Sequence, residues 1–223
     1  MATLNLSNAT KSFGNKPILT EASLTLETGE ILGIFGRNGS GKSTLLKMMF
    51  GTLQSDSIKM DINSCLFSPS ENIKKEKIAY LPQHPFLPKN VRVRDIIPMY
   101  FSSEEKQDAV FYDPGISKIT VKKAGELSLG ELKYFEIILI GNLNHPFLML
   151  DEPFSMLEPF HKESIKQFLI QLKNKKGIII TDHYYEDVLS ITTKNIILKD
   201  GKSEIIHSKE ELIKMEYLSK NSL

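Results

Sequence analysis

The sequence predicts an α/β fold, in which a mostly parallel sheet carries helices on both faces. Strand-like and helix-like segments alternate along the chain, most regularly after residue 130. The continuous apolar run at 31–35 is typical of a strand that is buried on both faces of such a sheet. With 41% hydrophobic and 25% charged residues in a chain of 223, the composition is that of an ordinary globular domain. We therefore expect one α/β domain over residues 1–223, with smaller parts attached to its core.

The elements before residue 82 are predicted mainly from alternation and turn residues. Short strands with polar and apolar residues in alternation are expected to form an N-terminal antiparallel β subdomain. Gly51 is a natural cap for the helix that precedes it. The predicted strands lie at 3–6, 22–26, 31–35, 57–67 (or a hairpin) and 78–81, and the helix lies at 42–50.

The stretch 84–130 differs in character and predicts a short inserted helical subdomain. Prolines punctuate a polar segment that contains helix-like pieces at 92–100 and 103–111. The second piece opens with Ser102-x-x-Glu105, which is a possible capping box.

After residue 130 the alternation of helix and strand predicts the rest of the core. Helices are expected at 130–143, 159–173, 184–190 and 208–218, and strands at 147–150, 177–181, 195–198 and 203–207. In the first of these helices Leu132, Phe135, Ile138 and Leu139 fall on one face, which indicates an amphipathic helix.

Charge, cysteine content and the length of the apolar runs argue against a nucleic-acid-binding, disulfide-stabilised or membrane-spanning protein. The chain has 28 Lys and Arg against 27 Asp and Glu, a net charge of +1, so no nucleic-acid partner is expected. The single Cys65 cannot form an internal disulfide, which favours a reducing compartment. The N-terminus has no apolar segment typical of a secretory leader, and the apolar runs are too short to span a bilayer. We expect a cytoplasmic protein.

A glycine-rich segment between the predicted strand 31–35 and the helix 42–50 matches the pattern G-x-x-x-x-G-K-[ST]. It comprises Gly36, Arg37, Asn38, Gly39, Ser40, Gly41, Lys42, Ser43 and Thr44. Its backbone N–H groups can surround phosphates at a helix N-terminus. Lys42 would reach the β- and γ-phosphates, Ser43 would hold Mg²⁺, and Thr44 would add a hydroxyl near the α-phosphate. The motif predicts a nucleoside triphosphate site.

Two carboxylates follow the buried strand 147–150, at the edge of the sheet where α/β folds bind their ligands. Asp151 would bind Mg²⁺, directly or through water. Glu152 is placed to orient and deprotonate an attacking water. Neighbouring residues of a strand point to opposite faces, so these two roles need a turn, which Pro153 favours.

Four further residues each have an ordinary structural interpretation when taken alone. Ser128 and the backbone N–H of Gly130 begin a predicted helix and could hold an anion. Gln83 ends a predicted strand, and His183 follows the strand 177–181.

In their order along the chain, these segments resemble the ATP-binding cassette (ABC) ATPases over almost the whole sequence. The resemblance places Phe13 where the family keeps an aromatic residue that stacks on adenine. It makes Gln83 the Q-loop residue, which contacts Mg²⁺ and couples to the partner, and His183 the switch histidine. The family's signature and Walker B motifs would correspond to Ser128, Gly130, Glu131, Asp151 and Glu152.

The family's mechanism implies both cofactors and partners. Two cassettes would bind ATP and Mg²⁺ and close head to tail, so that Ser128 and Gly130 of one contact the γ-phosphate bound to the other. The resemblance assigns catalysis to Lys42, Glu152 and His183, and the metal to Ser43, Gln83 and Asp151. It also implies transmembrane permease subunits, which would hold the chain at the cytoplasmic face of the cell membrane.

The sequence departs from the family pattern in three places. Leu129 stands where the signature has glycine, and Glu158 ends the D-loop where Asp is usual. The stretch from Gln83 to Ser128 is short for the helical subdomain. The first two bear on the dimer contact and the rate, and the third bears on the partner.

Two other functions compete with the ATPase subunit of a membrane transporter. The main alternative is a soluble regulatory or mechanical ABC ATPase, although such proteins usually have two fused cassettes or a long heptad insertion. A P-loop kinase or GTPase is the third function. Kinases lack the combination of the segment 127–131 (LSLGE) and His183, and the sequence has no Asn-Lys-x-Asp tetrapeptide of the kind by which GTPases recognise guanine.

Overall fold

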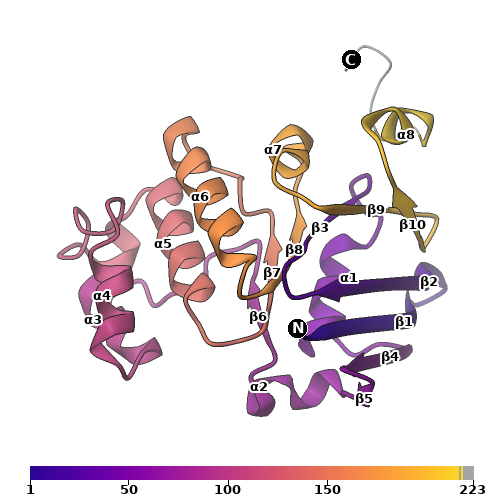
Figure 1. Cartoon of the computed structure of the whole chain (residues 1–223), viewed down its shortest axis with the longest axis horizontal. Coiled ribbons are helices and arrows are strands. Elements are labelled where there is room, and N and C mark those ends of the chain that lie inside the picture. The colour runs from indigo at the N-terminus through magenta and orange to yellow at the C-terminus, as the bar shows by residue number, and fades with distance from the viewer. Residues whose placement is uncertain (216, 218–223) are drawn as a thin grey trace.

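The computed structural model describes residues 1–215 and 217, and its strands join into one twisted sheet (Figure 1). The spatial order is β5-β4-β1-β2-β10-β9-β3-β8-β7-β6. The strands are β1 (Thr3–Phe13), β2 (Lys16–Glu27), β3 (Ile31–Phe35), β4 (Ser57–Ile62), β5 (Cys65–Leu66), β6 (Ile78–Leu81), β7 (Phe147–Asp151), β8 (Gly177–Thr181), β9 (Lys194–Lys199) and β10 (Lys202–Ile206).

The sheet has a parallel half and an antiparallel half. β6, β7, β8, β3 and β9 pair in parallel, whereas β9 with β10, β1 with β2, and β1 with β4 are antiparallel. β10 joins the two halves through a parallel contact with β2 at Lys202 and Glu21. The predicted α/β core and the N-terminal antiparallel strands are both present.

The N-terminal strands are longer than the sequence predicted. β1 and β2 form a hairpin over residues 3–27, whereas we expected strands only at 3–6 and 22–26. The register shifts between Leu6 and Ala9 and again at Lys11, and Asn8 has φ +53°. These bulges interrupt the alternation of polar and apolar side chains, so the sequence pattern did not predict the second half of β1 or the first half of β2.

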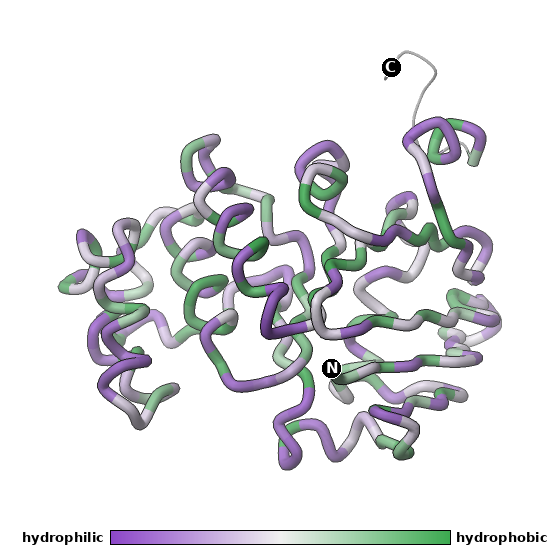
Figure 2. The backbone as a smooth tube through the Cα atoms, in the orientation of Figure 1, coloured by the Kyte–Doolittle hydropathy of each residue, from purple (hydrophilic) through white to green (hydrophobic). Residues whose placement is uncertain are grey.

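Alternate residues of the central strands face opposite sides, so helices cover both faces of the sheet. In β3, Ile31 and Phe35 pack into one hydrophobic cluster with α5 and α6, whereas Leu32 and Ile34 pack into another with α1. Figure 2 shows the hydrophobic segments running along these central strands. The helices are α1 (Lys42–Phe50), α2 (Asn72–Lys75), α3 (Val93–Tyr100), α4 (Glu104–Phe111), α5 (Leu129–Gly141), α6 (Pro159–Leu172), α7 (Tyr185–Leu189) and α8 (Lys209–Lys214).

Three details of the predicted helices were wrong. The helix α4 is capped by Ser103 without a side-chain hydrogen bond, so the capping box at Ser102 does not form. The helix α5 is not amphipathic, because every residue from Leu132 to Gly141 is buried between the sheet and α3, α4 and α6. The helix expected at 208–218 ends at Lys214, and residues 216 and 218 lie outside the described residues.

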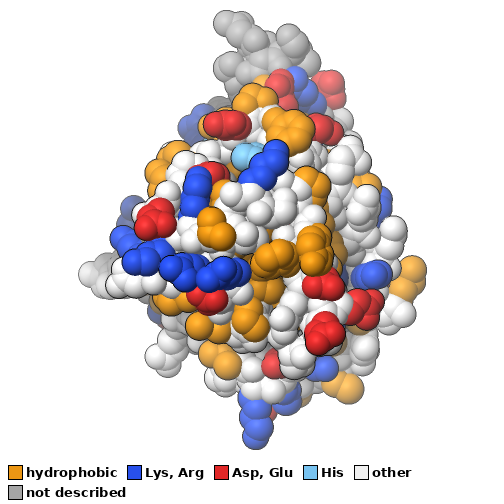
Figure 3. Space-filling view, turned by 90° about the vertical axis from the view of Figure 1, so that its left-hand side faces the viewer, with side chains coloured by type: hydrophobic (Ala, Val, Ile, Leu, Met, Phe, Trp, Pro, Cys, Tyr) orange, Lys and Arg blue, Asp and Glu red, His pale blue; other side chains and the backbone are white. Residues whose placement is uncertain are grey.

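The helices α3 and α4 lie at one end of the molecule, beyond α5, and β1, β2, β4 and β5 lie toward the other end (Figure 1). Figure 3 shows the face at the helical end, where a row of lysine and arginine side chains borders a group of hydrophobic ones. Within the described part of the chain, none of the helices is both long and apolar enough to cross a bilayer.

Candidate functional site

The glycine-rich loop connects β3 to α1 and needs its glycines for backbone reasons. Gly36 has φ +152°, and a Cβ there would lie 2.4 Å from Ser40 Oγ and 2.8 Å from the carbonyl oxygen of Leu198. Gly41 caps α1 with φ +100°, where a Cβ would lie 2.9 Å from Leu19. Larger residues would force the loop outward, so the glycines hold its N–H groups close around a small volume.

The ammonium of Lys42 lies inside this loop. Its Nζ donates hydrogen bonds to the carbonyl oxygens of Gly36 (2.6 Å) and Arg37 (3.3 Å). Burial lowers the pKa of Lys42, and the nearby carboxylates of Glu152 and Asp151 act in the opposite direction. A cation that is held by backbone carbonyls can turn to a phosphate with little desolvation cost, because it is already removed from water.

Asp151 ends β7 and accepts three hydroxyl hydrogen bonds. Ser43 Oγ and Thr181 Oγ1 both donate to its Oδ1, at 3.0 and 2.8 Å, while the hydroxyl of Tyr80 donates to its Oδ2 at 3.2 Å. Burial and the Asp151 charge raise the pKa of Tyr80 far above its ordinary value, so Tyr80 is a donor. The Ser43 hydroxyl and the Asp151 carboxylate converge as hard oxygen ligands of the kind that Mg²⁺ prefers, so the residues present fit this ion.

The turn expected at the two adjacent carboxylates, before Pro153, begins at Glu152. Glu152 has φ +54°, a left-handed conformation that is uncommon for a residue other than glycine. Its N–H still bonds to the carbonyl oxygen of Thr181 at 2.7 Å. The side chain of Glu152 is thereby directed to His183, and Glu152 Oε1 lies 3.0 Å from His183 Nε2.

A cavity of about 400 Å³ collects most of the predicted residues. It is lined by Phe13, Ile18, Asn38, Gly39, Gly41, Lys42, Ser43, Thr44, Gln83, Glu152 and His183. Phe13, at the end of β1, is 52% exposed, and Lys11 Nζ lies 5.3 Å from the centroid of its ring. Gln83 is held through its backbone, because Lys133 Nζ donates to its carbonyl oxygen at 3.0 Å.

Other predicted residues lie elsewhere. Arg37 and Ser40 line a second cavity, of about 650 Å³, together with residues of β2, of β9 and of the turn at 200–201 that follows β9. In the described part of the chain, Ser128 and Gly130 are not among the residues that line the 400 Å³ cavity. They begin α5, where Ser128 Oγ accepts the N–H of Glu131 and a Cβ on Gly130 would lie 2.7 Å from the Met156 carbonyl oxygen.

Sequence reasoning missed three residues that support the site: Tyr80, Thr181 and Asp182. Asp182 is 1% exposed, and its carboxylate accepts the N–H groups of Phe154 (2.7 Å) and Tyr184 (3.0 Å). Burial raises the pKa of Asp182, and backbone N–H groups oppose that rise. The polar residues at the end of an otherwise apolar strand, Thr181 and Asp182, were the available signal.

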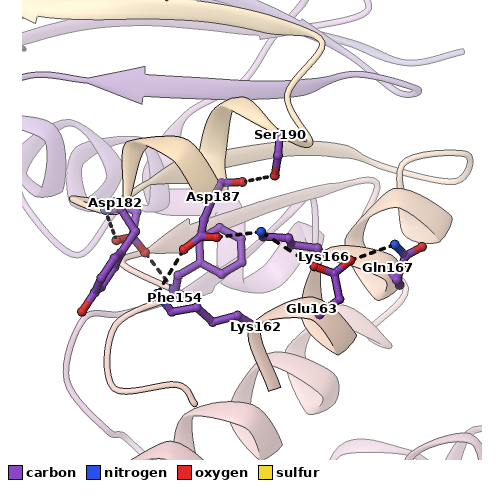
Figure 4. A network of polar contacts seen from close by, with 9 residues as sticks. Phe154, Lys162, Glu163, Lys166, Gln167, Asp182, Asp187 and Ser190 are labelled. Carbon is purple, nitrogen blue, oxygen red and sulfur yellow. Dashed lines mark hydrogen bonds and ion pairs between the residues drawn. The ribbon is translucent and has the colours of Figure 1, made fainter. Parts of the chain in front are cut away.

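Asp182 belongs to a polar network that extends into α6 and α7 (Figure 4). Asp187 of α7 lies between two lysines of α6, with Lys162 Nζ at 3.0 Å and Lys166 Nζ at 2.6 Å. Lys162 Nζ also lies 3.4 Å from the centroid of the Tyr184 ring. The loops after β7 and β8 are therefore joined to each other and to both helices.

The sequence of the chain matches the model of a known protein family. The sequence model of the family described as "ABC transporter" matches residues 19–155, which is more than half of the chain. The chain belongs to this family. The resemblance seen in the motifs is thereby confirmed, and the transport-associated ATP-binding subunit is favoured over the soluble regulatory ATPase.

Individual members of the family are similar to this chain over almost its whole length. The chain is 29% identical to the lipopolysaccharide export system ATP-binding protein LptB of Haemophilus influenzae, over 99% of this chain and 96% of LptB. It is 28% identical to the uncharacterized ABC transporter ATP-binding protein MJ1023 of Methanocaldococcus jannaschii, over 99% of this chain and 84% of that one.

Solved structures confirm the fold. A nucleotide-free ATP-binding cassette from an ABC transporter superposes with a TM-score of 0.83 at 23% identity, covering 99% of this chain and 97% of that one. The ADP conformation of MJ1267, another cassette of an ABC transporter, gives a TM-score of 0.79 at 25% identity, with coverage of 99% and 96%.

Proposed function

We propose that this cassette hydrolyses ATP to ADP and phosphate in a Mg²⁺-dependent reaction and thereby powers a membrane transporter. One observation carries the proposal most directly: Glu152 Oε1 and His183 Nε2 lie 3.0 Å apart at the cavity that Lys42 and Ser43 also line. The cavity is thus lined by a carboxylate, an imidazole and an ammonium. These are the groups needed to activate a water molecule for attack on a phosphate.

ATP binding is proposed to follow the residues of the cavity and its glycine-rich loop. The adenine would stack on the exposed ring of Phe13, which lines the cavity. The loop N–H groups from Gly36 to Thr44 and the N-terminus of α1 would hold the phosphates. Lys42 would exchange its carbonyl contacts for the β- and γ-phosphate oxygens.

We assign the metal to Ser43 and Asp151, with Gln83, which lines the same cavity as Ser43, completing the set. Ser43 Oγ and Asp151 Oδ1 lie 3.0 Å apart, close enough for both oxygens to coordinate one cation. Bound Mg²⁺ would supply positive charge that offsets the charge of the phosphate oxygens.

Hydrolysis then depends on Glu152 and His183. Glu152 accepts a proton as the oxygen of a water attacks the γ-phosphorus, and the bond from that phosphorus to the β–γ bridging oxygen breaks, leaving ADP and phosphate. His183, at 3.0 Å from the carboxylate, orients the water and the γ-phosphate. Asp182 holds the loop that carries His183 beside Phe154.

The active unit is proposed to be a pair of cassettes. Ser128 and Gly130 lie at the exposed start of α5, outside their own cavity as far as the described residues show. In a head-to-tail pair they would complete the site of the second cassette, whose signature would complete the first. The whole chain 1–223 would act as one cassette, with 84–130 as its inserted helical part.

The transport partner is proposed to be one or more transmembrane permease subunits, with the cassette on the cytoplasmic face of the membrane. The similarity to an ATP-binding protein of an export system over 99% of the chain supports this assignment. The near-neutral charge of +1 gives no electrostatic support for a nucleic-acid partner.

Two measurements test the proposal. Purified protein with Mg-ATP, alone and with its co-purified membrane partner, should release phosphate, and Lys42→Ala should abolish that release. Equal release by wild type and Lys42→Ala would overturn the catalytic assignment. A pull-down in mild detergent should recover a multi-span membrane protein. Ribosomal or chromosomal partners in its place would move the function to the soluble branch of the family.

A further inference from the structure

The two oxygens of the Asp151 carboxylate have different partners. Oδ1 accepts hydrogen bonds from Ser43 Oγ at 3.0 Å and from Thr181 Oγ1 at 2.8 Å, and so faces the glycine-rich loop. Oδ2 accepts the hydroxyl of Tyr80 at 3.2 Å. A carboxylate that is bound at both oxygens cannot rotate freely about its Cβ–Cγ bond, so its Oδ1 stays directed at Ser43.

Tyr80 reaches Asp151 from the strand at the edge of the sheet. β6 pairs in parallel with β7, and Tyr80 lies opposite Met149, two residues before Asp151. Only a long side chain with a terminal donor can span that offset. Serine or threonine at position 80 would be too short, and phenylalanine would span the distance without a hydrogen bond.

The Tyr80 ring is itself fixed by packing. Its centroid lies 5.2 Å from that of Phe50, the last residue of α1, and Tyr80 borders the hydrophobic cluster between α1 and the sheet. The helix α1 begins with Lys42 and Ser43 and ends with Phe50. It therefore supplies both the Ser43 hydroxyl that donates to Asp151 Oδ1 and the Phe50 ring that packs against Tyr80, the donor to Oδ2.

We infer that Tyr80 is a positioning residue, whose hydroxyl holds Asp151 in the orientation that binds the metal ion of the proposed ATP site. The inference rests on the proposed function. Groups that hydrogen-bond to metal ligands orient those ligands, and their removal commonly costs roughly 10- to 100-fold in metal affinity. Tyr80 contributes one of three hydroxyl contacts, so we expect an effect of roughly 10-fold, at the lower end of that range.

The test is Tyr80→Phe, which removes the hydroxyl and keeps the ring contact with Phe50. Tyr134→Phe is the matched control, because Tyr134 is a buried tyrosine whose hydroxyl likewise donates to a carboxylate, that of Asp113 at 2.9 Å. Tyr134 lies on α5 and is not among the described residues that line the 400 Å³ cavity.

Binding of a fluorescent ATP analogue is measured in EDTA and then during a Mg²⁺ titration, and thermal unfolding is followed for each variant. Tyr80→Phe should raise the Mg²⁺ concentration for half-maximal binding roughly 10-fold and leave binding in EDTA unchanged. Tyr134→Phe should match wild type in both. A Mg²⁺ requirement equal to wild type in Tyr80→Phe would overturn the inference. Failure of wild type to bind the analogue would instead overturn the proposed ATP site.

Discussion

Glu152 and His183 meet across two loops that follow neighbouring strands, with Glu152 Oε1 3.0 Å from His183 Nε2. The Glu152 side chain is 15% exposed and that of His183 is 45% exposed. Glu152 is thus mostly covered, His183 is partly exposed, and both line the cavity. A water held between them and a phosphate would contact a proton acceptor and an orienting group at once.

Glu152→Gln should retain ATP binding and slow hydrolysis by about 10²- to 10⁴-fold, because the amide cannot accept the proton of the water. The ATP-bound pair should then persist long enough to be seen as a dimer by size-exclusion chromatography. Glu21→Gln, at a surface ion pair with Lys202, is the control and should behave as wild type. Wild-type turnover in Glu152→Gln would remove Glu152 from its proposed role.

Asp182→Ala should separate the two loops that hold Glu152 and His183. The N–H groups of Phe154 and Tyr184 would lose their acceptor, at a cost of about 1–3 kcal/mol in the free energy of unfolding. We expect at least a 10-fold lower kcat, per folded molecule, with little change in the KM for ATP. Asp61→Ala removes a carboxylate that accepts the Ser64 N–H in the β subdomain, and should leave kcat unchanged. An unaltered kcat in Asp182→Ala would show that the loops hold their places without it.

Leu129→Gly should tighten the ATP-bound pair. Leu129 is the first residue of α5 and is 59% exposed, directly between Ser128 and Gly130. Its side chain would add volume beside the proposed contact with the other cassette's phosphate. Sedimentation in a Glu152→Gln background with ATP would measure the dimer, and Leu66→Gly, at a 76% exposed leucine in β5, is the control. A dimer that is no tighter than the parent would contradict this prediction.

Lys176 should make stability rise with pH. Its side chain is buried, and its Nζ donates to the carbonyl oxygens of Leu143 and, at 2.6 Å, His145. Burial, with Lys106 and Lys175 nearby, lowers the pKa of Lys176 from 10.5 to about 8. Because the folded pKa is the lower one, the unfolded chain binds more protons between these values, and the free energy of unfolding rises over that window.

The measurement is chemical unfolding of wild type and Lys176→Met between pH 7 and 10. The free energy of unfolding of wild type, relative to that of Lys176→Met, should increase as the pH rises above 8, by on the order of 1–3 kcal/mol in total. Lys59→Met, at an exposed lysine of β4, should show no such pH-dependent difference from wild type. A difference that is constant with pH would mean that Lys176 titrates at its ordinary value.

Much of the fold was predictable because its determinants are local. The apolar run at 31–35 and the capping glycine at Gly51 are properties of short segments, and both elements lie where the sequence indicated. Prediction failed where neighbours overrode the local pattern. The bulges of β1 hid the length of the hairpin, and the sheet, α3, α4 and α6 together buried every side of α5.

The sequence by itself determined the glycine-rich loop, since its glycines, Lys42 and Ser43 adopt a backbone conformation that a nine-residue segment encodes. It also placed Asp151, Glu152 and His183 at the ends of apolar strands. Only the tertiary structure decided what surrounds them. Tyr80 and Thr181 reach Asp151 because β6 and β8 flank β7, and Asp182 reaches Phe154 across the same strands. Such contacts depend on the order of strands in the sheet, which differs from their order along the chain.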